Sequence, residues 1–392
     1  MAIIGAVTGA ATVTPALAAP APAPVWSYAD LPPHKGYDRI DLVAAAGARD
    51  IWAVGTQDRY VRGVKRTYSG KDGTQTLAHF DGMTWHRAAL PPHGRIRSLS
   101  AAPSSVWALT SAHDGDEHDG NEVVRWDGRR WRSVPPPAPG ANEIAATSGG
   151  GAWLATWTRN ESRLLRHDGK AWHTIPSPKG LAVTDILVRG GRDVWVGGWL
   201  RSGRPGAQTE APALLHWDGR SLRRITIPAK VFPRGIAYGA SQVKDIVVAG
   251  QGDVWVTCYD LDGGPDDAIA LRRRGKTWRR VTPPARTASL HGVVDDGAGG
   301  VWFDYGLAEP MWHLHSGRIN KGRWSKTEAL RPPSGRGFGG YGAGEDIAHI
   351  PGTTLLIRAG ASSVPDVGKD AATTTASYNS TDGLIVAGPE AS

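Results

Sequence analysis

Short apolar runs separated by glycine-rich turns recur along almost the whole chain. The runs are rich in Val, Ile, Leu and Trp and are bounded by turn residues, a pattern typical of β-strands. An Asp-Gly pair lies between two such runs at residues 81–82, 127–128, 168–169 and 218–219. This pair is a strong hairpin signal, because a tight turn requires positive φ. The pattern therefore predicts an all-β protein built from antiparallel hairpins.

One unit repeats along the chain: an apolar strand, a turn, a strand with a central Trp, a variable loop and a hairpin of the form D-G-x-x-W. The Trp anchors of the second strand are Trp52, Trp107, Trp153, Trp195, Trp255 and Trp302. Their spacings of 55, 46, 42, 60 and 47 residues match the one-blade repeats of propellers. Each unit predicts four antiparallel strands, here called A to D in chain order, which is the composition of a propeller blade.

The repeats predict a seven-bladed β-propeller with four-stranded antiparallel blades. The expected blades span 38–92, 95–137, 142–178, 182–228, 236–284, 287–333 and 345–388. The last copy lacks a clear strand D. Residues 25–31 have the pattern of one, so we expect this N-terminal segment to supply the outer strand and close the ring. The alternative is that residues 384–387 serve as strand D.

The aromatic composition fits this architecture, with 17 Trp and only 4 Phe. A Trp on each strand B is large enough to fill the wedge between neighbouring blades. The Trp excess is therefore interpreted as packing.

The N-terminal region predicts export. Residues 1–18 are interpreted as a signal peptide that ends in the small-x-small sequence Ala16-Leu17-Ala18, and residues 19–24 as a Pro/Ala spacer. Residues 25–392 then form a single propeller domain. We expect a secreted, monomeric protein without a membrane span in the mature chain. The single cysteine, Cys258, excludes an intrachain disulfide and a cysteine-based metal site.

The net charge of +8 favours anionic partners. The basic residues cluster around the hairpins and strands D: Arg125, Arg129, Arg130, Arg132, Arg220, Arg223, Arg224, Arg272, Arg273, Arg274, Lys276, Arg279 and Arg280. The face that carries these hairpins could contact an anionic polymer. It could equally be a solvated outer edge that discourages edge-to-edge pairing.

The repeat unit resembles that of secreted bacterial propellers of the broad Kelch and Asp-box kind. The hairpins are similar to Asp boxes in placing Asp and Gly before a Trp, but their spacing differs, and only residues 380–383 match the start of an Asp box. The resemblance implies a propeller fold. It implies no sialidase activity, because Asp boxes are structural, and propellers host many unrelated functions.

Candidate site residues lie where strands A begin, on the face that carries the D–A and B–C loops. The position before the first apolar residue of strand A holds a carboxylate in five copies: Asp41, Glu143, Asp185, Asp245 and Asp346. These side chains could form an anionic ring that binds a cation or a sugar, or that supplies paired acids. Alternatively, they build blades by accepting backbone N–H groups of neighbouring strands.

Other candidates are positions where a blade departs from the repeat. Arg97 and His291 precede strand A where an acid is expected, and His291 could act as a base. Trp157, Trp199 and Tyr259 lie four residues beyond the strand-B Trp in three neighbouring blades. Aromatic rings beside carboxylates suit a sugar or a cation, although packing between blades is the alternative.

Three functions stay open at this point. The first, which we favour, is an extracellular binding protein that recognises a glycan, in the manner of a lectin, or a protein through the loop face. The second is a glycoside hydrolase or lyase that uses two of the strand-A carboxylates, which would ring the mouth of the propeller's central channel. The third is a protein-interaction scaffold. The chain has none of the common catalytic or nucleotide-binding motifs, and no cofactor and no metal is expected.

Overall fold

The computed structural model describes the chain in segments that together cover the ring. These are residues 27–28, 37–58, 74–92, 94–111, 121–158, 161–204, 207–233, 238–239, 241–250, 252–260, 268–284, 290–305, 309–315, 323–327, 337–338, 346–365 and 378–388. The expected signal peptide and spacer at residues 1–24 lie outside the described residues.

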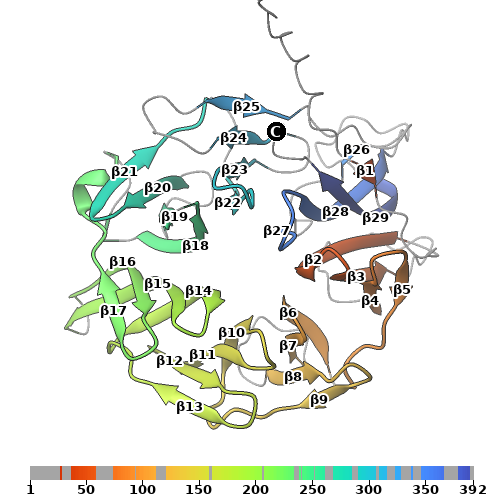
Figure 1. Ribbon diagram of the computed structural model, residues 1–392, viewed down its shortest axis with the longest axis horizontal. Coiled ribbons are helices and arrows are strands. Elements are labelled where there is room, and N and C mark those ends of the chain that lie inside the picture. Colours follow the sequence, from red (N-terminus) through yellow and green to blue (C-terminus); the bar gives the residue numbers. More distant parts are fainter. Residues whose placement is uncertain are drawn as a thin grey trace, which may run out of the picture.

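Within these segments, six four-stranded antiparallel sheets follow one another around a central axis, and a five-stranded sheet completes the ring (Figure 1). Blade one contains β2 (Tyr37–Gly47), β3 (Asp50–Asp58), β4 (Thr74–Phe80) and β5 (Trp85–Arg87). Blade two contains β6 (Arg95–Ala102), β7 (Ser105–Ser111), β8 (Glu122–Trp126) and β9 (Trp131–Ser133). Blade three contains β10 (Ala141–Ala146), β11 (Ala152–Thr158), β12 (Glu161–His167) and β13 (Trp172–Ile175).

The other three blades repeat this order of strands A, B, C and D. Blade four contains β14 (Leu181–Gly190), β15 (Asp193–Arg204), β16 (Ala207–Trp217) and β17 (Leu222–Ile225), followed by the short 3-10 helix η1 (Ala229–Val231). Blade five contains β18 (Ser241–Ala249), β19 (Asp253–Asp260), β20 (Ile269–Arg274) and β21 (Thr277–Val281). Blade six contains β22 (Gly292–Asp295), β23 (Val301–Asp304), β24 (Trp312–Leu314) and β25 (Trp324–Lys326).

The remaining sheet, here called the closing sheet, is not a regular blade. It contains β1 (Ser27–Tyr28), β26 (Gly337–Phe338), β27 (Ile347–His349), β28 (Leu356–Pro365) and β29 (Tyr378–Gly388). Its order is β1-β29-β28-β26, and β27 also pairs with β28. The prediction of a β-propeller with four-stranded antiparallel blades is confirmed, but the count of seven such blades is wrong, since the described segments form six.

The irregular sheet arises because its strands come from both ends of the chain. The last repeat has no Asp-Gly hairpin leading to a strand D. Ser27 pairs with Ala387 and Tyr28 with Val386, so β1 lies on the outer side of β29. The expected pairing of the N-terminal segment is thus observed. The alternative, in which residues 384–387 act as the outer strand, is wrong, because these residues belong to β29 and pair with β28 on its other side.

The strand-B tryptophans pack between neighbouring blades, as their repetition predicts. Trp153 of blade three clusters with Leu181 and Val196 of blade four, and Trp195 of blade four clusters with Val243 and Trp278 of blade five. The other four strand-B Trp side chains are packed against the next sheet in the same way. The core is therefore distributed over the seams between sheets, and burial of these large rings holds the sheets together.

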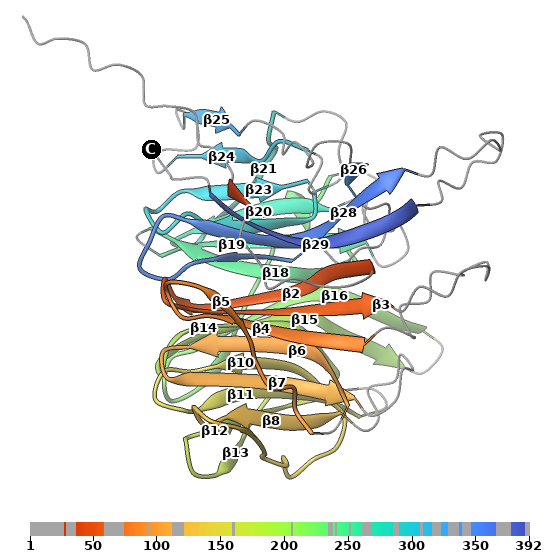
Figure 2. The same cartoon turned by 90° about the vertical axis from the view of Figure 1, so that its right-hand side faces the viewer.

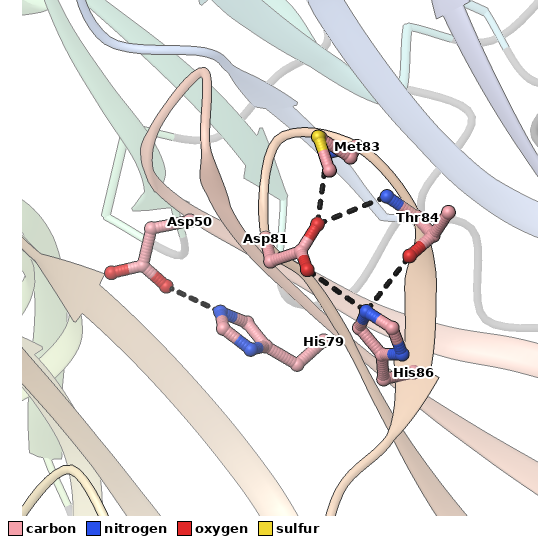
Figure 3. Close-up of polar contacts among 6 residues, drawn as sticks. All are labelled: Asp50, His79, Asp81, Met83, Thr84 and His86. Carbon is pink, nitrogen blue, oxygen red and sulfur yellow. Dashed lines mark hydrogen bonds and ion pairs between the residues drawn. The ribbon is translucent and has the colours of Figure 1, made fainter.

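A cross-strand basic residue covers several of these rings. In blade one, His79 stacks on Trp52 with ring centroids 4.2 Å apart, and Asp50 Oδ1 lies 2.9 Å from His79 Nε2 (Figure 3). Asp50 Oδ1 also accepts a 2.7 Å hydrogen bond from Trp52 Nε1. The same arrangement of Asp, Trp and His recurs in blade four. These His residues therefore support the Trp packing.

Four C–D hairpins share a second arrangement, here called the Asp clip. In blade one, Asp81 Oδ1 accepts hydrogen bonds from the backbone N–H groups of Met83 and Thr84 at 2.8 and 2.9 Å (Figure 3). Its other oxygen lies 2.9 Å from His86 Nε2. Equivalent contacts surround the hairpin carboxylates of blades two, three and four, which are Asp127, Asp168 and Asp218. The Asp of the motif thus closes the turn and pairs with one His or Arg side chain on strand D.

Strand A carries a β-bulge near its start in blades one to five. The extra residue is Asp41, Arg97, Asn142, Thr184 or Lys244. In three of these blades, the bulged side chain donates to a backbone carbonyl in the next strand A or just before it: Asn142 to Val183, Thr184 to Val243, and Lys244 to His291, which precedes β22. The bulge therefore turns a side chain sideways to join neighbouring blades.

Candidate binding site at the channel mouth

Five carboxylates occupy consecutive sectors of the ring at one end of the channel. They are Glu143 in blade three, Asp185 in blade four, Asp245 in blade five, Asp304 in blade six and Asp346 beside the closing sheet. We call this set the acidic arc. Glu143, Asp185 and Asp245 come directly after the bulge of their strand A, which fixes their direction. They lie on the loop face, where strands A begin and strands B end. This face is on the right in Figure 2, where strand β3 ends.

Blade six supplies its carboxylate from strand B. Gly292 of β22, at the position expected to hold an acid, pairs with Asp304 of β23. In blade five the corresponding pair is Asp245 on strand A and Thr257 on strand B. In blade six the acid is therefore on strand B instead of strand A. A side chain on Gly292 would point toward Asp245, because its Cβ would lie 3.5 Å from Asp245 Oδ2. The sequence pattern followed strand A alone and therefore missed Asp304.

Asp41 does not belong to this arc. It is the bulged residue of β2, and Leu42 occupies the position that holds the carboxylate in blades three to five. Asp41 Oδ2 instead accepts a 2.7 Å hydrogen bond from Thr56 Oγ1. The prediction that Asp41 lies in register with the other four acids is therefore wrong by one residue, because the bulge adds a residue that periodicity cannot reveal.

Two members of the arc connect neighbouring sheets. Asp185 Oδ2 accepts a 2.6 Å hydrogen bond from the N–H of Ile246 in blade five. Asp346 Oδ2 accepts a 2.9 Å hydrogen bond from the N–H of Val43 in blade one. These contacts match the structural alternative stated for the acids, in which they accept backbone N–H groups of the next blade.

Carboxyl groups of the arc have pKa values that are raised from their usual acidic range. Burial within the protein and the charge of Asp245 raise the pKa of Asp185 to about 7. Burial is also the largest cause that raises the pKa of Asp346 to about 6. The pKa of Glu143 is raised well above its usual value by burial and by Asp185, and burial raises the pKa of Asp245. Mutual repulsion across the channel mouth adds to these shifts.

A buried arginine balances part of this charge. Arg358 of β28 donates a 2.7 Å hydrogen bond to Asp304 Oδ1, and both side chains are almost completely buried. The pair joins blade six to the closing sheet. The repeat pattern contained no signal for it, because Arg358 lies in the degenerate last copy.

Two of the candidate aromatic residues lie side by side on the same face. Trp157 of β11 and Trp199 of β15 have ring centroids 6.0 Å apart and an interplanar angle of 46°. Both rings are half-buried, in contrast to the buried Trp on each strand B. Trp199 Nε1 has no hydrogen-bond partner among the described residues. That nitrogen is buried, so what the pair offers is the partly exposed indole surface, on the strands paired with those that carry Glu143 and Asp185.

The third candidate aromatic, Tyr259, is also half-buried, and burial together with the charge of Asp245 raises its pKa. Tyr305 of blade six is buried and packs in the core between blades five and six. Tyr259 thus lies near Asp245, whereas the contact between Trp157 and Trp199 joins blades three and four.

The remaining candidates lie apart from this cluster of rings. Arg97 is the exposed bulged residue of blade two, a sector in which Ser98 replaces the acid. His291 is exposed, and its N–H donates a 2.8 Å hydrogen bond to the carbonyl of Asp304. Its backbone carbonyl accepts from Lys244 Nζ at 2.6 Å. The mouth is therefore acidic over five sectors and carries Arg97 in blade two.

Such a mouth can attract a cationic group and hold it against indole rings. Among the described residues, no group of three or more His, Cys, Asp or Glu side chains is arranged to hold a metal ion. The described part of the chain also has no helix long and apolar enough to cross a membrane.

Comparison with known proteins supports the fold and leaves the function open. No protein-family model matches the chain, and no curated protein matches its sequence. Among solved structures, YCF48 bound to a D1 peptide matches with a TM-score of 0.53 and 14% identity, covering 92% of this chain and 96% of that one. A virginiamycin B lyase from Staphylococcus aureus matches with a TM-score of 0.54 and 12% identity, covering 93% and 98%. At these identities the likeness establishes that the chain has the β-propeller fold.

Proposed function

We propose that this protein is a recognition protein that binds a partner on the loop face, around the mouth of the channel. The observation that carries the proposal is the half-buried pair of Trp157 and Trp199, which lies on the strands B of blades three and four, whose strands A carry Glu143 and Asp185. Half-exposed indole rings are frequent binding hot spots, because they bury a large area at a small entropic cost.

The charge of the mouth favours a partner that presents a cationic side chain. The arc gathers carboxyl groups with raised pKa values on one side of the channel, and a bound cation would favour their charged forms. Tyr259 lies close enough to Asp245 for its pKa to respond to that carboxylate. A Lys or Arg side chain would gain both a cation–π contact and an opposite charge. We therefore propose a protein partner, bound through a segment with exposed basic residues. The peptide-bound state of YCF48 supports this by analogy of fold.

The contacts of the carboxylates favour recognition over catalysis. Asp185 and Asp346 each accept a backbone N–H of the next sheet, so part of their acceptor capacity supports the ring. A hydrolase would need two carboxyl groups free to face the substrate on either side of one bond.

A glycan is the second candidate partner, and the indole pair is the observation that favours it. Neighbouring Trp rings offer an apolar surface against which a sugar ring can stack, and acids nearby can accept hydrogen bonds from its hydroxyl groups. Action outside the cell is part of the proposal and rests on residues 1–18, and the monomeric state is a further part of it.

Parallel binding screens test the proposal. The wild type and a Trp157→Ala/Trp199→Ala variant would be applied to a peptide array graded in positive charge and to a glycan array. We expect basic peptides to bind the wild type and to lose about tenfold or more in affinity to the variant. Trp85→Ala, which removes a half-buried ring from the outer strand β5, is the matched control and should bind like the wild type. Binding that is the same in the double variant would reject the proposed site, and loss of glycan binding alone would favour the second candidate.

A further inference from the structure

Blade five departs from the Asp clip on the face opposite the acidic arc. The position that holds Asp81, Asp127, Asp168 or Asp218 in other blades is Arg274 here, followed by Gly275. The basic residue five positions later is retained as Arg279, so an attractive pair in four hairpins becomes two like charges in this one. The turn also differs, because Gly275 has φ of 57° whereas the Asp-Gly glycines have φ of 92° to 97°.

The substitution leaves a concentrated positive charge on the β20–β21 hairpin. Six of the nine residues from 272 to 280 are Arg or Lys. Asp253 pairs with Arg272, whose Nε donates to it at 2.9 Å, and lies 3.4 Å from Arg274 Nε. One carboxylate therefore faces two of these cations, and Arg274, Lys276, Arg279 and Arg280 are exposed.

Neighbouring elements extend this charge along the outer wall. The helix η1 lies against β21 and carries the exposed Lys230 (Figure 1). The outer strand β17 of blade four adds the exposed Arg224. Because strand D is the outermost strand of each blade, these side chains form a strip along the edge of the ring and not a pocket.

We propose that this strip, from β17 through η1 to the β20–β21 hairpin, binds a linear polymer of phosphate groups. Arginine is the residue best suited to phosphate oxygens, because its guanidinium can donate two parallel hydrogen bonds. The aromatic ring of the hairpin, Trp278, is buried, so the hairpin has no exposed ring on which nucleic-acid bases could stack. The phosphate backbone alone is therefore the recognised chemistry, and its affinity depends on charge and salt.

Binding of inorganic polyphosphate tests this proposal. We expect the wild type to bind it at low salt, with an affinity that falls as salt rises. Lys276→Glu/Arg280→Glu should weaken binding by about tenfold or more. The control is Arg129→Glu/Arg130→Glu, which makes the same change of net charge at exposed positions of the blade-two hairpin, where Asp127 is present. This control should bind nearly as well as the wild type.

A second variant restores the repeat. Arg274→Asp recreates the Asp-Gly pair of the other hairpins, so we expect it to fold and to lose affinity for polyphosphate. Equal losses in the two double variants would overturn the proposal, because overall charge and not this strip would then control binding. Tighter binding of oligothymidylate or heparin than of polyphosphate would overturn the choice of ligand, and absence of salt-dependent binding in the wild type would overturn both.

Discussion

Tryptophan side chains occur in two environments in this chain, which differ in solvent exposure. Trp153 is fully buried in the seam between blades three and four. Trp157 follows four residues later on the same strand and is half-buried next to Trp199. One strand thus carries a packing residue and a candidate contact residue.

Alanine substitutions should separate the two roles. Trp153→Ala removes a completely buried ring and should lower the free energy of unfolding by about 3–5 kcal/mol. Trp157→Ala should have a clearly smaller effect, since its ring remains partly in water. Chemical denaturation followed by circular dichroism would measure both, and similar losses would show that Trp157 is a core residue.

The raised pKa of Asp185 should make stability depend on pH in an unusual direction. Its pKa is about 7 in the folded protein against 3.8 as the ordinary value, so the folded state holds this proton more tightly than the unfolded state. Its contribution to stability is therefore largest at low pH and declines as pH rises from about 4 to about 7. Asp185→Asn keeps an acceptor for the N–H of Ile246 and removes the charge.

We expect Asp185→Asn to unfold at a higher temperature than the wild type at about pH 8, with a gain on the order of 1–2 kcal/mol after screening by water in the channel. The two proteins should converge only below the ordinary pKa of 3.8, where Asp185 is protonated in both the folded and the unfolded state. Thermal unfolding at several pH values is the measurement. A variant less stable than the wild type at about pH 8 would show that the charged form of Asp185 is the stabilising one.

Prediction of single residues succeeded where a side chain recurs in each repeat. It failed where a blade carries that side chain on a different strand. The strand-B Trp residues and four arc carboxylates were identified from periodic positions. Asp304 was missed, because it comes from strand B opposite Gly292 and the periodic position holds no acid. Arg358 was missed because the last copy has lost the pattern.

At the scale of elements, the Asp clip shows how a two-residue motif specifies a hairpin. The backbone hydrogen bond from Arg130 is the largest cause that lowers the pKa of Asp127 to about 2, followed by the side chain of Arg132. The carboxylate therefore stays charged over almost the whole pH range. The D-G signal predicted these turns correctly, and the partner at the fifth following position became evident only in three dimensions.

Removing one clip should loosen its hairpin without unfolding the ring. Asp127→Ala deletes the acceptor for the N–H groups of Arg129 and Arg130 and the partner of Arg132. We expect faster amide hydrogen exchange at these two residues and a small decrease in melting temperature, well below that of Trp153→Ala. Unchanged exchange would mean that the strands alone hold the turn.

At the scale of the whole molecule, the closing sheet distinguishes the observed ring from the predicted one. Seven regular blades were expected, because the repeats were counted along the chain. The last copy has no hairpin to a strand D, so β1 pairs on one side of β29, while β26 and β27 both pair with β28. Pairings between distant segments cannot be read from local periodicity, although the pattern of residues 25–31 correctly indicated a partner strand.

The buried pair of Arg358 and Asp304 should be critical for this seam. Arg358→Met would leave Asp304 uncompensated near Asp245 and Asp346, and we expect a loss of about 3–5 kcal/mol in the free energy of unfolding. Adding Asp304→Asn should recover much of that loss, because the remaining buried group is then neutral. Denaturant titration of the single and double variants would measure this, and a single variant as stable as the wild type would contradict it.

The pairing of Tyr28 with Val386 also bears on how the protein is made. A ribosome adds on the order of 5–20 residues per second, so the first strand of this contact waits about 20–70 s for the other. During that interval the six regular blades can assemble in order while β1 remains without its partner. Because this contact has a very large sequence separation, ring closure belongs to the end of folding. A chaperone or an export machinery that acts during synthesis would meet an open, C-shaped molecule.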